Sequence, residues 1–188
     1  YKKHQREQGL LEWDCDRLVR NERVIWAACM VACGDADGAV TGNTRRFGAS
    51  LEKIKQVVKP RPGEIMFGLN LVVHKGKTIF VGDTSVHEYP NAEQLSEIAI
   101  SSARVVRLFG FEPKVAFVSH STFGQPLTSR TKHIKEAVEI LKKKQVNFEF
   151  DGDMQPDVAL NKEYQSLYPF SKIVGNANIL IMPGQHSA

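Results

Sequence analysis

The residues best suited to chemistry lie in one short segment, Ser119-His120-Ser121-Thr122-Phe123-Gly124. It holds three hydroxyl groups, an imidazole and a glycine, Gly124, that lets a ligand approach the backbone closely. Hydroxyls and free backbone N–H groups suit the oxygens of a phosphate or carboxylate, so the segment is a candidate anion site. The alternative is that Ser119, Ser121 and Thr122 satisfy the backbone of their own turn, as such residues usually do.

Charged and titratable residues elsewhere in the chain could complete such a site. His120 could act as a general base, but no Ser–His–Asp spacing is present, and a hydrogen-bonding role in the loop is equally open. Asp83 and Asp153 each close a predicted strand, where an acidic side chain either caps a turn or positions a ligand. Arg45 and Arg46 could grip a phosphate, with a surface salt bridge as the alternative. We assign no catalytic residue and predict no metal site.

The elements that must position these groups form a repeating pattern over residues 78–124. Thr78–Val81 and Val115–Val118 are apolar runs, and apolar residues recur at helical spacing between Asn91 and Gly110. Apolar strands joined by a helix are typical of a parallel sheet that is covered on both faces. Ligands of such sheets bind beyond the carboxyl ends of the strands, which is where both polar loops lie.

The rest of the chain continues this α/β pattern. Met66–Val73 is predicted to form a hairpin with Thr78–Val81, which places an antiparallel pair beside the parallel strands. The other predicted helices are 22–34, 50–58, 129–144 and a short one from Asp157, and the other predicted strands are 39–41, 148–150 and 178–182. The fold class is therefore α/β, a three-layer α/β/α arrangement with a mixed, mainly parallel sheet.

Composition narrows the possible classes of function. The 188 residues are 42% hydrophobic and 24% charged, which is ordinary for a soluble globular protein. No apolar run approaches the roughly 20 residues of a membrane helix, so we predict no membrane partner. The net charge is only +4, and its densest cluster, Lys142–Lys144, ends a predicted helix, which favours a solvated helix end over a nucleic-acid surface. Three cysteines are interpreted as buried free thiols in a reducing cytoplasm.

Several motifs, taken in order, resemble one family. They are DADGAVTG (35–42), RPG (61–63), FVGDTSVHEYPNAEQLSEIA (80–99), FGFEPKVAFVSHSTFG (109–124), FDGDMQPDVAL (150–160) and GNANILIMP (175–183). Together they resemble the phosphotransacetylase family, which also includes phosphate butyryltransferases. The resemblance implies a two-lobed fold similar to that of isocitrate and isopropylmalate dehydrogenases, with coenzyme A and acyl phosphate meeting between the lobes.

The same resemblance implies how the chain divides. We expect residues 1–188 to be a fragment of one phosphotransacetylase-like domain in a longer polypeptide, because the chain opens at Tyr1 and ends at Ala188 without a closing element. Roughly 1–66 would belong to the first lobe, 67–175 to the second, and 176–188 would return to the first.

One departure from the family bears on activity. Glu52 stands roughly where transacetylases carry an active-site arginine, and an acidic side chain would repel the acyl phosphate that an arginine holds. In this respect the chain is more similar to the C-terminal phosphotransacetylase-like domain of bacterial NADP-dependent malic enzymes. That similarity implies a regulatory domain that senses acetyl-CoA or another acyl-CoA and forms oligomers.

The resemblance also implies partners outside this chain. No cofactor is expected here; acetyl-CoA would be the effector, and NADP and Mg or Mn would bind an attached malic enzyme domain that oxidises malate to pyruvate and CO2. The rival is an active phosphate acetyltransferase that recruits Arg45 or Arg46, and a third option is a purely structural oligomerisation domain. Under the sensing hypothesis, Ser121→Ala weakens the acyl-CoA response while leaving fold and basal activity intact.

Overall fold

The computed structural model describes residues 9, 11–124 and 129–187, which fall into two compact units, Tyr1–Gly63 and Glu64–Ala188. The first unit is helical in its described part. Its helices are α2 (Glu12–Asn21), α3 (Arg23–Cys33) and α4 (Phe47–Lys55). Ile25 and Ala28 of α3 pack with Val57 in a small buried cluster. Helix α3 ends at Gly34, whose left-handed φ of 81° closes the helix at low steric cost.

Two predictions for this unit need correction. The strand predicted at 39–41 is wrong, because those residues are exposed and adopt no regular structure, and Val40 is fully exposed. A strand needs a partner, and the described part of this unit contains no other strand. The helix predicted at 50–58 begins earlier, at Phe47, and ends at Lys55.

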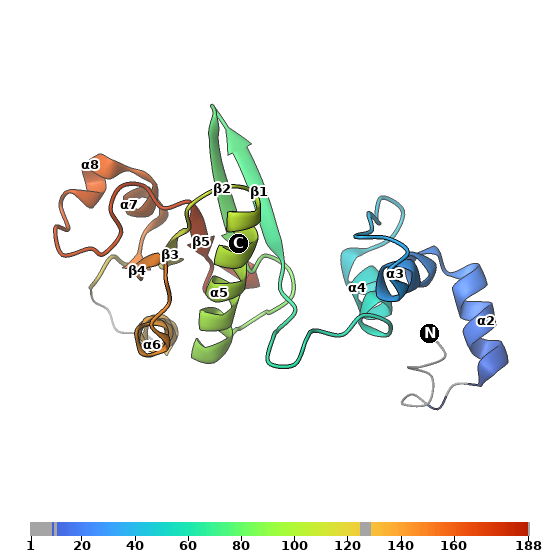
Figure 1. The fold of residues 1–188 in the computed structure, drawn as a ribbon. Helices are drawn as coiled ribbons and strands as arrows, with labels where there is room; N and C mark the ends of the chain where they lie inside the picture. The colour runs from blue at the N-terminus through green and yellow to red at the C-terminus, as the bar shows by residue number, and fades with distance from the viewer. Residues whose placement is uncertain (1–8, 10, 125–128, 188) are drawn as a thin grey trace. The chain divides into compact units, whose positions relative to one another are not determined.

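The second unit holds a five-stranded sheet whose order is β1-β2-β5-β3-β4 (Figure 1). Its elements are β1 (Leu69–His74), β2 (Lys77–Gly82), α5 (Ala92–Leu108), β3 (Lys114–Val118), α6 (Ser129–Lys144), β4 (Glu149–Met154), α7 (Pro156–Leu160), α8 (Lys162–Gln165), β5 (Ile179–Ile181) and the 3-10 helix η1 (Gln185–Ser187). Only β1 runs antiparallel to its neighbour; the other pairs are parallel. This confirms the predicted mixed, mainly parallel sheet.

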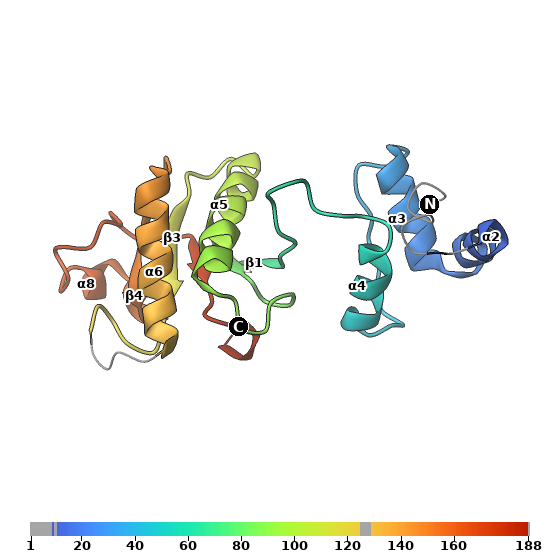
Figure 2. The ribbon, with the colours of Figure 1, turned by 90° about the horizontal axis from the view of Figure 1, so that it is seen from below.

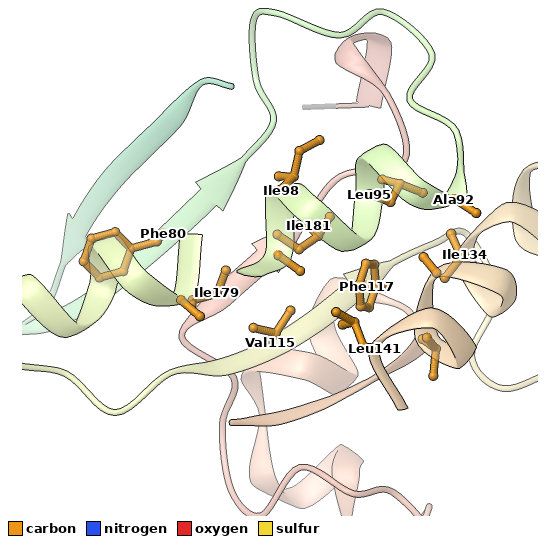
Figure 3. Packing of buried hydrophobic residues seen from close by; sticks show 14 of the residues in the cluster. Phe80, Ala92, Leu95, Ile98, Val115, Phe117, Ile134, Leu141, Ile179 and Ile181 are labelled. Carbon is orange, nitrogen blue, oxygen red and sulfur yellow. The ribbon is translucent and has the colours of Figure 1, made fainter. Parts of the chain in front are cut away.

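Helices cover both faces of this sheet. Side chains alternate along β3, so that Val115 and Phe117 face one cluster while Ala116 and Val118 face the other. Helices α5 and α6 lie side by side over the first face (Figure 2) and contribute the buried leucines and isoleucines that Figure 3 shows against the sheet. Figure 1 shows α7 on the opposite side of β3 and β4 from α6, and Ala159 packs there. The second unit therefore has the predicted three layers, with the sheet between two layers of helices.

Strand β5 occupies the centre of the sheet. Ile179–Ile181 pairs in parallel with both β2 and β3, and all three residues are buried. The structure includes β5 in the same unit as the other strands. The chain reaches this place because parallel strands are joined by long crossovers, so sequence order does not give sheet order. The lobe division of a complete domain stays a prediction.

Within the described ranges, no helix is both long and apolar enough to cross a membrane.

Candidate functional site

The carboxyl ends of the parallel strands bring the predicted polar segments to one edge of the sheet. Ser119, directly after β3, donates its backbone N–H to Met154 O of β4 at 2.9 Å. Phe123 donates its N–H to Asp153 O at 2.8 Å, and Met182, directly after β5, donates its N–H to Gly82 O at 2.7 Å. The ends of β2, β5, β3 and β4 therefore form one continuous edge that carries Asp83, the Ser119–Gly124 loop and Asp153.

Strand β4 extends further than the sequence pattern predicted. We placed its end at residue 150, but pairing with β3 continues to Met154. The extension contains buried polar residues, which are not typical of a strand sequence. Asp151 is one of them, and its Oδ2 accepts a hydrogen bond from Lys172 N at 2.8 Å. Asp153 therefore lies within β4, at the irregularity where the pairing passes from Gly152 to Met154.

Asp83 is a buried and fully hydrogen-bonded carboxylate. Its side chain accepts backbone N–H groups from Gly68 (2.8 Å), Ser85 (3.0 Å) and Val86 (3.1 Å) on Oδ1 and from His87 (2.9 Å) on Oδ2. Burial acts to raise the pKa of Asp83, but the hydrogen bonds from Ser85, His87, Gly68 and Val86 favour the ionised form and together lower the pKa below its ordinary value. Asp83 thus organises the loop that follows β2.

His87 joins this carboxylate through its ring, a relationship that sequence reasoning missed. Its Nδ1 lies 2.7 Å from Asp83 Oδ2, and its side chain is 18% exposed. The sequence signal was the spacing Asp-x-x-x-His at a predicted strand end. That spacing is too common to identify a contact without the loop geometry, in which successive N–H groups turn back toward the carboxylate.

Ser121 and Asp153 form the second pair at the edge. Ser121 Oγ donates to Asp153 Oδ2 at 2.7 Å, and both side chains are buried. Ser119 Oγ lies 3.4 Å from Ser121 Oγ and accepts the Ser121 N–H at the same distance. Asp153 Oδ1 is buried and has no hydrogen-bond partner in the structure as described. One of the two predicted aspartates is therefore saturated with donors, whereas the other is not.

The rest of the loop is held by its neighbours. Thr122 Oγ1 accepts the Gln155 N–H at 3.0 Å, and the Gln155 side chain donates to His120 O at 3.0 Å. Phe123 has a left-handed φ of 48°, and its ring lies 5.0 Å from that of Phe170. Ser119 accepts a backbone N–H of its own turn, as the alternative interpretation expected, whereas the Ser121 and Thr122 hydroxyls bond to residues of and next to β4.

A cavity of about 380 Å³ opens at this edge. Ser119 and the exposed His120 contribute its polar side, and the remaining lining is mostly apolar. Its other lining residues are Val118, Ile134, Pro156, Met182, Pro183 and Ser187. The cavity can therefore accept a ligand that combines an apolar part with a few hydrogen-bonding groups.

The two arginines that we predicted as phosphate ligands, Arg45 and Arg46, belong to the first unit. Arg45 Nη2 is 3.7 Å from Glu22 Oε2, and Lys53 also pairs with Glu22. Hydrogen bonding from Lys53, more than the charge of Arg45, lowers the pKa of Glu22. Arg46 is exposed and directly precedes α4. Arg45 thus forms the surface salt bridge that was its alternative role.

Glu52, which we predicted to stand where transacetylases would carry an arginine, is also exposed. Its side chain is 70% exposed and contacts Lys55 at 3.1 Å. In the described part of the chain, no three His, Cys, Asp or Glu side chains gather as a metal site would require.

These features define the class of three-layer α/β proteins whose polar loops gather beyond the carboxyl ends of parallel strands. Comparison with known proteins identifies the family within this class. Residues 1–188 match the family described as "Phosphate acetyl/butaryl transferase", and the chain belongs to that family.

Individual relatives include both malic enzymes and acetyltransferases. The chain is 43% identical, over its full length, to an NADP-dependent malic enzyme of Rhizobium meliloti, of which it covers 25%. It is 32% identical over 173 residues to a phosphate acetyltransferase of Buchnera aphidicola, covering 91% of this chain and 24% of that protein. The chain is also similar to a crystal structure of a phosphotransacetylase from Streptococcus pyogenes, with a TM-score of 0.86 and 27% sequence identity. The match covers 97% of this chain and 56% of the Streptococcus pyogenes chain. The chain thus spans about a quarter of these curated relatives.

Proposed function

We propose that this chain is the regulatory, acyl-CoA-sensing part of a cytoplasmic NADP-dependent malic enzyme, with acetyl-CoA as effector and without transacetylase turnover of its own. The attached malic enzyme domain would bind NADP and Mg or Mn and convert malate to pyruvate and CO2. Regulation requires only that the effector bind two states of the enzyme with different affinity, so a cleft inherited from a transacetylase can serve without chemistry.

The observation that carries the proposal is the Ser121–Asp153 pair. Ser121 has one hydroxyl proton, and that proton is directed at Asp153 rather than at a ligand oxygen. A buried carboxylate beside the loop also repels a phosphate or acyl phosphate, which a transacetylase must hold. The neighbouring cavity, mostly apolar with three polar residues, instead suits the acyl and pantetheine part of an acyl-CoA.

Two further observations support the proposal. The chain resembles NADP-dependent malic enzymes along its whole length. Glu52, at the place where transacetylases carry an arginine, is exposed and bonds only to a neighbouring lysine among the described residues. It therefore offers no positive charge to an acyl phosphate.

We also propose that the chain contributes to a homo-oligomer. Strand β1 lies at the end of the strand order, and Leu71, Val72 and Val73 on it are 44–65% exposed. An exposed apolar edge strand favours pairing with another chain. Analytical ultracentrifugation of the longest natural polypeptide that contains this chain tests this part; a monomer at micromolar concentration would contradict it.

A second candidate function is phosphate acetyltransferase activity, which the names of relatives such as the Buchnera enzyme favour. It would use Arg45 or Arg46 in place of the missing arginine. Two assays on the longest natural polypeptide separate the candidates: calorimetric titration with acetyl-CoA, and formation of acetyl phosphate from acetyl-CoA and phosphate. Sensing predicts binding without turnover, whereas sustained turnover that falls on replacing both arginines by glutamine would favour the transferase.

A further inference from the structure

The Asp83 carboxylate does not need the His87 ring in order to be satisfied. Four backbone N–H groups already donate to it, three to Oδ1 and that of His87 itself to Oδ2. Four backbone donors fix the carboxylate in position and favour its ionised form. The ring bond of 2.7 Å is therefore an additional interaction.

The consequence of that additional bond falls on the imidazole. Asp83 accepts from His87 Nδ1–H, which fixes both the orientation of the ring and the tautomer of its neutral form. In that neutral form the other nitrogen, Nε2, carries a lone pair and is an acceptor. Histidines that bind a ligand or transfer a proton through the far nitrogen are commonly oriented by a carboxylate in this way. In the described part of the chain, His87 is the only histidine whose ring is held by a carboxylate.

The loop that carries His87 packs against the segment that lines the cavity. Gln185 donates its N–H to Glu88 O at 3.2 Å, and the His186 ring lies 5.3 Å from that of Tyr89. The same segment contributes Met182, Pro183 and Ser187 to the cavity lining. The His87 loop and the Ser119–Gly124 loop therefore flank the end of β5 from its two neighbouring strands, β2 and β3.

We propose that His87 is a further ligand-binding residue of this site and that its Nε2 accepts a hydrogen bond from an N–H or O–H group of the pantetheine arm of an acyl-CoA. This inference rests on the proposed acyl-CoA function. An acceptor nitrogen favours the pantetheine arm over the phosphate groups of such a ligand, because ionised phosphates offer only acceptors, whereas the pantetheine arm offers amide and hydroxyl donors. A ligand that lacks the matching donor leaves a buried acceptor of the site unpaired, so the site binds that ligand more weakly.

Two substitutions separate the roles of the two ring nitrogens. His87→Asn keeps a donor near the Nδ1 position and removes Nε2. His87→Gln places a polar group near the Nε2 position, where its amide oxygen can accept. If His87 only stabilises Asp83, the asparagine variant should retain more acetyl-CoA binding than the glutamine variant. If Nε2 contacts the ligand, the glutamine variant should retain more. Because the carboxylate retains four backbone donors in either variant, both proteins should fold.

The experiment titrates acetyl-CoA, pantetheine and adenosine 3′,5′-bisphosphate into the longest natural polypeptide and its two variants. His87→Asn is expected to weaken acetyl-CoA and pantetheine about tenfold, the bisphosphate less than twofold, and the melting temperature little, with partial recovery in His87→Gln. Equal acetyl-CoA binding by wild type and His87→Asn would overturn the role of His87 and leave the proposed function standing. A parallel loss for the bisphosphate would overturn the assignment to the pantetheine arm. A wild type that binds no acetyl-CoA would overturn both proposals.

Discussion

Ser121 Oγ donates a 2.7 Å hydrogen bond to Asp153 Oδ2 and so ties the loop after β3 to the end of β4. The other carboxylate oxygen, Oδ1, is buried without a partner in the described structure. By contrast, Asp83 at the end of β2 accepts donors on both oxygens. The two predicted aspartates thus differ in kind: Asp83 organises its loop, whereas Asp153 retains unused acceptor capacity beside the candidate site.

Ser121→Ala removes the one side-chain donor to Asp153 among the described residues. We predict a loss of about 1–3 kcal/mol in the free energy of unfolding, because a buried carboxylate is left without its partner, together with weaker acetyl-CoA binding. The sequence-based expectation that this variant leaves the fold intact is therefore refined to a folded but less stable protein. Urea unfolding and calorimetric titration measure the two effects.

Ser96→Ala is a matched control for that variant. Ser96 is also buried but bonds to the Glu93 carbonyl within α5. It should change acetyl-CoA affinity less than twofold. If both variants weakened acetyl-CoA equally, the loss would report stability alone and the Ser119–Gly124 loop would be removed from the site.

Acid sensitivity should follow Asp83. Its folded-state pKa is lowered, so it contributes stability that is fully present above the unfolded pKa of about 4 and is lost as the pH falls through the folded pKa. Asp83→Asn should flatten this acid limb and cost at least about 1.5–3 kcal/mol at pH 7, because charge-assisted hydrogen bonds are lost. Urea unfolding from pH 7 to pH 3 checks the prediction.

Asp157→Asn provides the comparison for Asp83. Asp157 is exposed, and the bond recorded for its side chain is to the N–H of the next residue. We expect its variant to retain the acid limb of wild type. An unchanged acid limb in Asp83→Asn would contradict the role assigned to the buried carboxylate.

Gly152→Ala should destabilise the second unit. Gly152 has a φ of 154°, and a Cβ built there would lie 2.7 Å from Phe117 Cβ and 2.8 Å from Phe117 O. Backbone atoms of a central strand cannot move aside cheaply, so we predict a loss of about 1–3 kcal/mol or more. Thermal unfolding measures it. A variant as stable as wild type would show that β3 and β4 are not packed at this distance.

Alkylation should distinguish the cysteines of the first unit. Burial raises the pKa of the Cys15 thiol, and the charge of Asp14 adds to the effect, whereas Cys33 is exposed. Because the thiolate is the reacting species, iodoacetamide should modify Cys33 at least about ten times faster than Cys15 in the native protein. Peptide mass spectrometry follows both sites. Equal alkylation rates at the two cysteines in the native protein would contradict the burial of Cys15. We expect the two rates to become equal only after denaturation.

Much of the second unit could be predicted from the sequence because its signals are local. Apolar runs at Thr78–Val81 and Val115–Val118 gave two parallel strands, and Asn91 caps α5 by accepting Gln94 N–H at 2.8 Å, close to the predicted start. Strand β4 was predicted too short because Asp151 and Asp153 look like loop residues. Their burial depends on distant donors, Lys172 N for Asp151 and the Ser121 hydroxyl for Asp153, which no local pattern contains.

Long-range relationships were the main features missed. The place of β5 between β2 and β3 depends on crossover connections and not on its own residues. The strand predicted at 39–41 has the composition of a strand but no partner in the described part of its unit. For the site, sequence position predicted that Asp83 and Ser121 lie at strand ends, but only geometry shows that His87 bonds to one aspartate and Ser121 to the other.

Titration of the longest natural polypeptide that contains this chain with acetyl-CoA, followed by an assay of acetyl phosphate formation on the same sample, tests the central claim most directly. The account predicts saturable binding that raises the melting temperature, because a ligand bound only by the folded state stabilises it, together with no acetyl phosphate above the uncatalysed rate. Steady formation of acetyl phosphate, or the absence of both heat and stabilisation, would contradict it.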